Sequence, residues 1–229
     1  MTASITGISS MATRQVLADL ADAYRLHCGV VVAFESVGGV DAARRVQAGE
    51  PFDVVALAAD AIDKLIAAGR VIAGSKTDLV RSEVAIAARA GAPRPDIASG
   101  DALRRAVLSA RSLGYSTGPS GVALAKLFER WGIADAVRDR LVQAPPGVPV
   151  GQLVASGEVE LGFQQLSELI HLDGIVVLGT MPRGLEIVTT FSAGLCAASA
   201  QPEAVRALLA FLPSPDTADA KRRHGMEPV

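Results

Sequence analysis

Small polar residues stand at three points where a strand-like run gives way to a helix-like run. These points are Ser9-Ser10, residues 36–39 and residues 117–121. A helix N-terminus leaves backbone N–H groups unpaired and carries partial positive charge, so Ser, Thr and Gly there let an anion approach the bare backbone. One such turn is an ordinary helix cap. Three at the carboxyl ends of strands, where open α/β sheets bind ligands, predict an anion site.

Two glutamines, Gln164 and Gln165, follow a predicted strand over residues 159–163. Their amides can donate to carboxylate or oxyanion oxygens without adding charge. The alternative is that both face solvent, as glutamines usually do. Glu35 lies near the predicted site and is a candidate general base if its pKa is raised, although a solvated carboxylate is the simpler interpretation. The sequence therefore offers ligand contacts but assigns no catalytic residue.

Neither a metal nor a cofactor is expected from the remaining reactive residues. His27, His171 and His224 are far apart and lack metal-ligand spacing. Cys28 and Cys196 form no C-x-x-C pair; two buried thiols are expected, and a disulfide stays open for an exported chain. The G-x-S-x-G, P-loop and G-x-G-x-x-G patterns are absent from the sequence.

The charge balance argues against a polyanionic partner. Lys plus Arg is 22 against 24 for Asp plus Glu, with both signs interspersed, so no nucleic acid or acidic membrane surface is expected. The sequence contains no run of 18 uncharged apolar residues, so no transmembrane helix is expected. The N-terminus as written has no basic segment followed by an apolar core, so it predicts a cytoplasmic protein. A chain from which a signal peptide had been removed would look the same, and that protein would be periplasmic.

Hydrophobic periodicity predicts a mixed α/β protein. In the first third, strand-like and helix-like runs alternate in three β-loop-α units, which indicates a mainly parallel sheet. The predicted strands are residues 5–8, 30–34, 53–57, 83–88, 112–116, 141–143, 159–163, 175–178 and 186–198. The predicted helices cover residues 11–27, 60–68, 101–110, 122–131, 203–212 and 217–224, with others ending near 46 and 156. A length of 229 residues suits two lobes of about 100 residues each.

Several segments carry a resemblance to a known family over nearly the whole chain. They are Ser9-Ser10, residues 46–54 (VQAGEPFDV), residues 57–60 (LAAD), residues 161–167 (LGFQQLS) and the ending at residues 224–228 (HGMEP). In their order and spacing the chain resembles the periplasmic molybdate-binding proteins and their organic-acid relatives. The resemblance implies a two-lobed type II periplasmic-binding-protein-like fold, in which crossing strands join two mainly parallel sheets flanked by helices. Lobe 1 would be residues 1–82 with 190–229 and lobe 2 residues 83–189, with the ligand cleft between them.

The same resemblance implies which residues line the cleft. Carried over by position, they are Ser10, Gly38, Gly39, Ser120, Gly121, Gly147, Val148 and Gln165; Ser9, Ser36, Thr117 and Gln164 are added on chemical grounds. Molybdate binders usually have a serine where this chain has Gly39 and commonly a tyrosine where it has Gln165. An unpaired oxygen in a dry site costs about 1–3 kcal/mol. A di- or tricarboxylate is therefore favoured over a compact oxyanion.

Two functions follow as expectations. The first is a monomeric solute-binding protein for a small anion, delivering to an ABC-type permease if it is exported. The second is an enzyme, because the Gln164-Gln165 pair and the Ser120-Gly121 turn are also similar to a branch that includes aconitate isomerase. That enzyme moves a double bond by a proton shift and needs no cofactor. A cytoplasmic sensor is a third interpretation, for which the sequence supplies no partner-binding helix.

Overall fold

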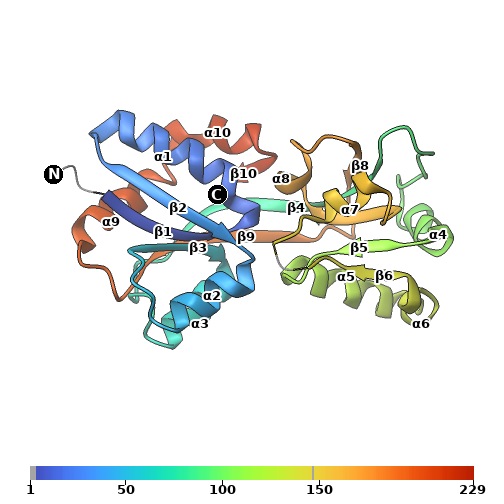
Figure 1. Ribbon diagram of the computed structural model, residues 1–229, viewed down its shortest axis with the longest axis horizontal. Helices are drawn as coiled ribbons and strands as arrows, with labels where there is room; N and C mark the ends of the chain where they lie inside the picture. Colours follow the sequence, from blue (N-terminus) through green and yellow to red (C-terminus); the bar gives the residue numbers. More distant parts are fainter. Residues whose placement is uncertain (1–3, 146) are drawn as a thin grey trace. The chain divides into compact units, whose positions relative to one another are not determined.

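The computed structural model describes residues 4–145 and 147–229 and divides them into two compact units. Unit 1 comprises the residues up to Ser82 together with Thr189–Val229, and unit 2 is Glu83–Val188. The chain passes between the units twice, within β4 (Thr77–Arg89) and at the start of β9 (Val188–Leu195) (Figure 1).

Unit 1 is built on a mixed sheet in the order β2-β1-β3-β9-β4. Its other strands are β1 (Ser4–Ser10), β2 (Val31–Val37), β3 (Val54–Ala58) and β10 (Met226–Pro228). β1 is parallel to β2 and β3, whereas β9 is antiparallel to β3 and β10 is antiparallel to β4. All five residues of β3 are buried, as expected for a central strand covered on both faces.

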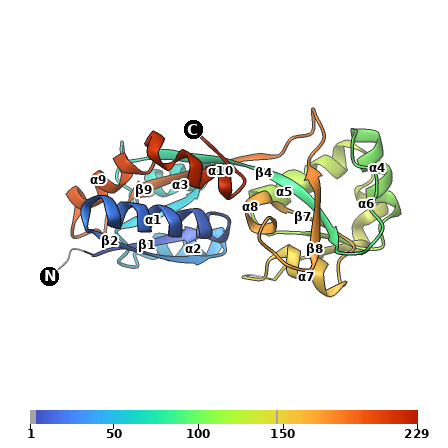
Figure 2. The same ribbon diagram turned by 90° about the horizontal axis from the view of Figure 1, so that it is seen from above.

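Helices cover both faces of this sheet (Figures 1 and 2). One apolar cluster joins the strands to α1 and α9, and a second joins them to α2 and α3. Alternate residues of β3 enter the two clusters, as the period of two in a strand requires. The helical elements of unit 1 are η1 (Met11–Thr13), α1 (Arg14–Cys28), α2 (Gly39–Gln47), α3 (Ala59–Ala67), α9 (Pro202–Phe211), η3 (Pro215–Thr217) and α10 (Ala218–Arg223).

Unit 2 has the sheet order β4-β7-β5-β6, with β8 paired to β4. Its strands besides β4 are β5 (Leu113–Tyr115), β6 (Leu141–Gln143), β7 (Leu161–Gln165) and β8 (Ile175–Thr180). β5 is parallel to β6 and β7, so these three strands end at one edge of the sheet. The helical elements are α4 (Gly100–Ser109), α5 (Pro119–Arg130), α6 (Ala134–Val137), η2 (Arg138–Arg140), α7 (Val150–Ser156) and α8 (Leu166–Leu169).

Two paired glycines bring α7 close to the unit 2 sheet. Gly114 of β5 lies opposite Gly162 of β7. A Cβ atom at Gly162 would lie 2.5 Å from the Cγ2 atom of Val154, and one at Gly114 would lie 2.9 Å from the Cγ1 atom of Val150. Only a residue without a side chain permits this approach. The glycines therefore set how closely α7 lies over the sheet.

The structure confirms the mixed α/β class and changes several boundaries. Ser9-Ser10, Ser36 and Gln164-Gln165 lie inside strands, where loops after strands were predicted. Polar residues close these strands because the carboxyl edge of the sheet carries polar contacts, so loss of hydrophobicity does not mark the strand end. β4 also begins six residues before the predicted strand at 83, and the short elements α6, α8 and β10 were not predicted.

The expectation of two buried thiols is wrong for Cys28. Both cysteines are free, but Cys28 is exposed at the last residue of α1 and only Cys196 is buried. The Sγ atom of Cys28 donates to the carbonyl of Tyr24, one turn earlier, at 3.3 Å. The buried face of α1 does not extend to this residue.

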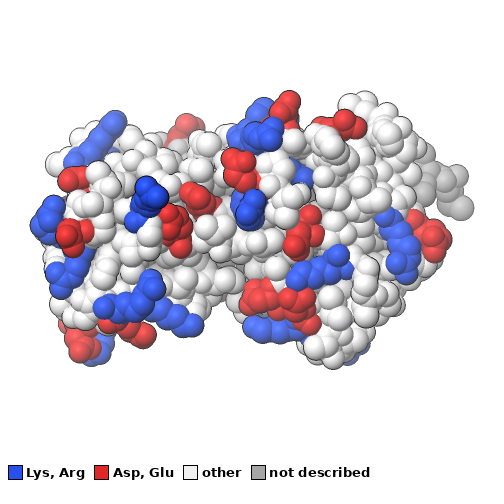
Figure 3. Space-filling view, turned by 180° about the vertical axis from the view of Figure 1, so that it is seen from behind, with Lys and Arg blue, Asp and Glu red and all other residues white. Residues whose placement is uncertain are grey.

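The sequence predicted that basic and acidic side chains are interspersed. On the face shown in Figure 3 they are interspersed, and no basic patch is seen there. Among the helices that the structure describes, none combines the length and apolar character needed to cross a membrane.

Lys221 of α10 is an unusual residue of the unit 1 core. Its side chain is 0% exposed, and its Nζ atom has no hydrogen-bond partner in the described part of the chain. Burial lowers its pKa below 10.5, the usual value for a lysine. A buried donor left unsatisfied costs about 1–3 kcal/mol, so this lysine weakens the fold at neutral pH.

Lys221→Met is accordingly expected to raise the free energy of unfolding by about 1–3 kcal/mol at pH 7, measured by urea denaturation. Because the pKa is lower in the folded chain, the unfolded chain binds more protons and wild-type stability rises as pH approaches 10.5. The gain from the substitution should therefore shrink in that direction. Arg222→Met, at the exposed neighbouring position, is the control and should change little. A destabilised Lys221→Met variant would contradict the expectation.

Candidate functional site

In unit 1 three serines meet at the carboxyl ends of β1 and β2. The register pairs Ser9 with Ser36, and their Oγ atoms lie 2.8 Å apart. Ser10 is the last residue of β1, and its Oγ atom accepts from the N–H of Ala12 at 3.2 Å. Its carbonyl accepts from Thr13 Oγ1 at 3.0 Å. The register and the 3-10 turn therefore hold the three hydroxyls in fixed positions.

The N-terminus of α2 adjoins this serine group. Gly39 is the first residue of α2 and Gly38 precedes it. A Cβ atom at Gly39 would lie 3.7 Å from the Oγ atom of Ser10, an ordinary contact. The first N–H groups of a helix have no partner within the helix. The five residues predicted in unit 1, which are Ser9, Ser10, Ser36, Gly38 and Gly39, thus lie together.

In unit 2 a second group of hydroxyls surrounds the N-terminus of α5. Thr117 lies between β5 and α5, and Ser120 and Gly121 occupy the first turn of α5. The Oγ atoms of Ser116 and Ser120 lie 3.1 Å apart. A Cβ atom at Gly121 would lie 1.9 Å from the carbonyl oxygen of Ser116, so only glycine fits there. This contact presses the first turn of α5 against the end of β5.

Gly147 and Val148 lead from β6 into α7. Gly147 has a φ of 78°, in the left-handed region that favours glycine. The N–H of Val148 donates to the carbonyl of Pro145 at 3.0 Å, which closes the turn. Because β5, β6 and β7 are parallel, this turn, the start of α5 and the end of β7 lie at the same edge of the unit 2 sheet.

Both glutamines at the end of β7 are buried, at 2% exposed for Gln164 and 4% for Gln165. Their burial excludes the interpretation that they face solvent. The side chain of Gln164 forms a bridge: its Oε1 atom accepts from the N–H of Gly151 at 3.2 Å, and its Nε2 atom donates to Glu168 at 2.7 Å. The two residues are neighbours in a strand, so Gln165 points to the opposite face of the sheet.

Glu168 is a carboxylate that sequence reasoning missed. It lies in α8, four residues beyond Gln164, and is half-buried. Burial raises its pKa to about 7, and the hydrogen bond from Gln164 acts in the opposite direction. Helix α8 has only four residues and therefore no periodicity to reveal it. The available signal was the four-residue spacing between an amide at a strand end and a carboxylate.

Glu35 does not meet the condition set for a general base. Arg45 donates to both of its carboxylate oxygens, with Nη2 and Oε2 at 3.0 Å. This bond lowers the pKa of Glu35, although the small burial of the group acts in the other direction. A carboxylate paired in this way is a weaker base than a free one.

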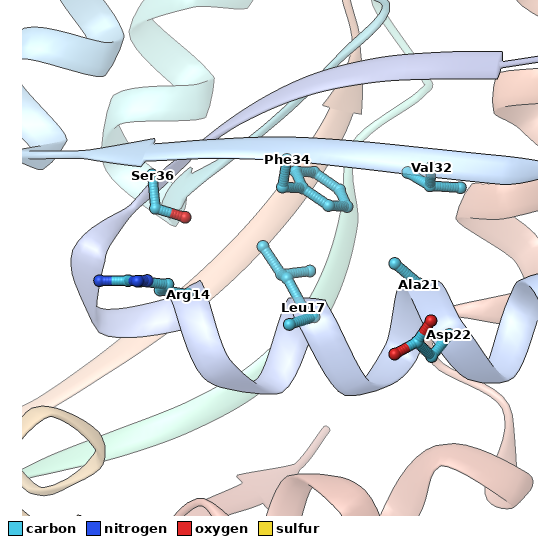
Figure 4. Close-up of a pocket in the computed structure, with 8 residues that line it drawn as sticks. Arg14, Leu17, Ala21, Asp22, Val32, Phe34 and Ser36 are labelled. Carbon is cyan, nitrogen blue, oxygen red and sulfur yellow. The ribbon is translucent and has the colours of Figure 1, made fainter.

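A separate cavity of about 620 Å³ lies between α1 and β2 in unit 1 (Figure 4). Arg14 and Asp22 stand at its two ends, with Leu17 and Phe34 between them. Of the predicted site residues, only Ser36 lines it; the remaining lining residues are Ala18, Ala21 and Val32. Within the described residues, no three His, Cys, Asp or Glu side chains are grouped so as to hold a metal ion.

Comparison with known proteins places this fold and site in context. The model of a family described as bacterial extracellular solute-binding protein matches residues 5–227. An aconitate isomerase from Pseudomonas sp. is 39% identical over 99% of this chain and 88% of its own length. The molybdate-binding protein ModA of Azotobacter vinelandii is 27% identical over 90% of this chain and 83% of its own.

A solved structure also matches over almost the whole chain. The periplasmic molybdate-binding protein of Azotobacter vinelandii superposes with a TM-score of 0.80, at 19% identity, and covers 97% of this chain and 98% of the other. The predicted type II periplasmic-binding-protein fold is thereby confirmed.

Proposed function

Because this chain belongs to the bacterial extracellular solute-binding protein family, we propose that it binds a small organic anion through hydroxyls, amides and backbone N–H groups. The resemblance predicted from the sequence, to molybdate-binding proteins and their organic-acid relatives, is confirmed. The observation that carries the proposal is the gathering of small polar residues at the first turns of α2 and α5. Helix N-termini of this kind bind anions.

The proposed ligand is a di- or tricarboxylate. The predicted contacts, which are Ser9, Ser10, Ser36, Gly38, Gly39, Thr117, Ser120, Gly121, Gly147, Val148, Gln164 and Gln165, include no charged side chain. Gly39 and Gln165 replace a hydroxyl and a phenol expected in molybdate binders, and amide donors suit the planar oxygens of carboxylates. The relative with 39% identity acts on a tricarboxylate by its name, whereas the molybdate binder is 27% identical.

A second candidate function is a cofactor-independent isomerase acting on such a ligand. The observation that favours it is the 39% identity to an aconitate isomerase over 99% of the chain. Migration of a double bond by a proton shift needs a base beside an acidic C–H and donors for the carboxylates. The same donors serve tight binding, so the two functions differ in whether a proton-transferring group is present.

The family description also bears on partners. We propose that the chain acts outside the cytoplasm as a monomer and, as a binder, delivers its ligand to an ABC-type permease. Support comes from the family's description as extracellular. One solved structure of this fold, with a TM-score of 0.76, is the substrate-binding domain of a molybdenum ABC transporter from Clostridium difficile.

A thermal-shift screen tests the ligand class. The compounds are molybdate, tungstate, sulfate, phosphate, citrate, cis- and trans-aconitate and tricarballylate. A ligand at 100 times its Kd adds about 2.7 kcal/mol of stability, so the tricarboxylates are expected to raise the melting temperature clearly. A shift with molybdate or tungstate alone would reject the ligand class, and no shift with any compound would reject anion binding.

Substitutions in the two groups of donors test the site. Gly39→Val places methyl groups at the first turn of α2, and Ser120→Pro removes a hydroxyl and an N–H from a helix turn that tolerates proline. Each is expected to weaken tricarboxylate binding at least tenfold, measured by calorimetry, while the melting temperature of the unliganded protein stays near the wild-type value. Gly39→Ala is the graded control, because a single Cβ fits at that position. Unchanged affinity in both variants would contradict the site.

A further inference from the structure

Glu168 lies beside the predicted ligand contacts of unit 2. Helix α8 begins at the residue after β7 ends, so Glu168 is within one turn of the carboxyl end of that strand. β7 is parallel to β5 in the register that pairs Tyr115 with Phe163. The carboxylate therefore belongs to the same edge of the sheet as the first turns of α5 and α7.

The position of the Glu168 carboxylate is fixed on one side only. Gln164 donates to its Oε2 atom at 2.7 Å, and Gln164 is itself held by the N–H of Gly151 in the first turn of α7. Glu168 has no other hydrogen bond and no ion pair within the described residues. One oxygen is thus anchored through a buried amide, and no bond to the other is found among the residues that the structure describes.

In the described residues, the helices and strands that pack around Glu168 carry no competing titratable group. Helix α8 packs against β7 and β8, and none of these three segments carries another titratable side chain. Helix α7, whose Gly151 N–H donates to Gln164, carries none either. The nearest such residues along the chain are His171 and Asp173. Burial raises the pKa of Glu168 to about 7. At neutral pH the group is therefore present both as base and as acid, as a proton-shuttling residue should be.

We propose that Glu168 is the catalytic acid–base residue of a double-bond isomerase, an inference that rests on the second candidate function above. Its carboxylate takes a proton from the CH₂ group that adjoins both a carboxylate and the double bond of an unsaturated tricarboxylate. The electron pair of the broken C–H bond forms the new C=C bond. The pair of the old double bond takes a proton back from Glu168 at the far carbon, so the substrate and product have the same composition.

The hydroxyl and N–H donors of the site hold the carboxylates and stabilise the negative charge that develops on them during proton removal. Gln164 is a positioning residue in this scheme. It touches the carboxylate of Glu168 and aligns it, and it lowers the pKa of that group by its hydrogen bond.

The experiment follows cis- and trans-aconitate in D₂O by proton NMR, which reports both interconversion and deuterium incorporation. Glu168→Gln is expected to lower kcat by at least about 10²-fold, the usual contribution of a general acid or base. Aconitate should still raise the melting temperature of this variant, and Glu168→Asp should recover part of the rate. Glu158→Gln, an exposed glutamate of the same unit, is the control and should keep the wild-type rate.

A second measurement decides the matter if Glu168→Gln does not fold. Gln164→Leu removes the hydrogen bond that lowers the pKa of Glu168. The wild-type rate should fall as pH drops through about 7, and the midpoint of this fall should move to higher pH in the variant. An unchanged midpoint would overturn the proposal.

The remaining outcomes separate this proposal from the proposed function. If the wild type turns over and Glu168→Gln does so within about threefold, Glu168 is not the acid–base residue and the isomerase stands. If the wild type binds aconitate but neither converts it nor exchanges its protons, the proposal for Glu168 falls and anion binding stands. If no tricarboxylate binds, the proposed ligand class fails as well.

Discussion

Replacing Gly121 with alanine is expected to destabilise the protein by about 3 kcal/mol or more and to abolish ligand binding. The new Cβ atom would lie 1.9 Å from the carbonyl oxygen of Ser116 and 3.0 Å from the ring of Tyr115. The first clash is with backbone, which cannot rotate away as a flexible side chain can. The first turn of α5 must therefore move away from the end of β5, and the hydroxyl of Ser120 moves with it.

Urea denaturation measures the loss of stability, and calorimetry with a tricarboxylate measures the loss of binding. Gly118→Ala is a matched control three residues earlier. A Cβ atom there meets nothing within 4 Å, and the φ of −80° suits any residue. The control should fold and bind nearly as the wild type does. Equal effects of the two substitutions would contradict the assigned clash.

Asp53→Ala is expected to cost about 3 kcal/mol or more at neutral pH. Asp53 is 7% exposed and accepts four hydrogen bonds from three residues of unit 1. The donors are the N–H of Thr6 at 2.9 Å, Thr6 Oγ1 at 3.0 Å, Ser199 Oγ at 2.6 Å and Gln201 Nε2 at 2.9 Å. Removing the carboxylate leaves these donors without their acceptor, and it separates β1 and β3 from the segment that leads into α9.

The same carboxylate predicts a sensitivity to acid. Burial alone would raise the pKa of Asp53, but the hydrogen bonds from Ser199, Thr6 and Gln201 outweigh burial and lower it below 3.8. A lowered pKa in the folded chain stabilises the protein above about pH 4, and this stabilisation is lost as pH falls through the folded-state pKa.

Denaturation curves of wild type and Asp53→Asn between pH 7 and 3 test this dependence. The difference in stability should narrow below pH 4. Asp60→Asn, at an exposed position in α3, is the control and should leave the curve almost unchanged. A constant difference across the range would show that the charge of Asp53 does not contribute.

The hydrophobic pattern predicted the mixed α/β class because helices and strands depend on local patterns, whereas the two-lobed fold was implied by the family resemblance. Val16, Leu17, Leu20 and Tyr24 recur at helical spacing and do form the buried face of α1. The turns at Ser10 and Ser120 likewise follow from residue types that favour strand ends and helix starts.

Contacts between distant segments could not be predicted in the same way. The bond between Ser9 and Ser36 depends on strand register, which local composition does not specify. The raised pKa of Glu168 depends on its burial in the folded chain, and the full burial of Lys221 depends on the packing of α10. Neither can be read from the neighbouring residues in the sequence. Glu35, by contrast, is not a candidate general base, because Arg45, ten residues later in α2, donates to its carboxylate.

The two passages of the chain between units also determine when each part can fold during synthesis. Unit 2 is one continuous segment, Glu83–Val188, so all its strands have been made before β9 emerges. Unit 1 is split, and its central pairing of Val54 with Leu195 joins residues on either side of that segment. The ribosome must therefore synthesise all of unit 2 before the sheet of unit 1 can form completely. Until then β3 has no β9 to pair with.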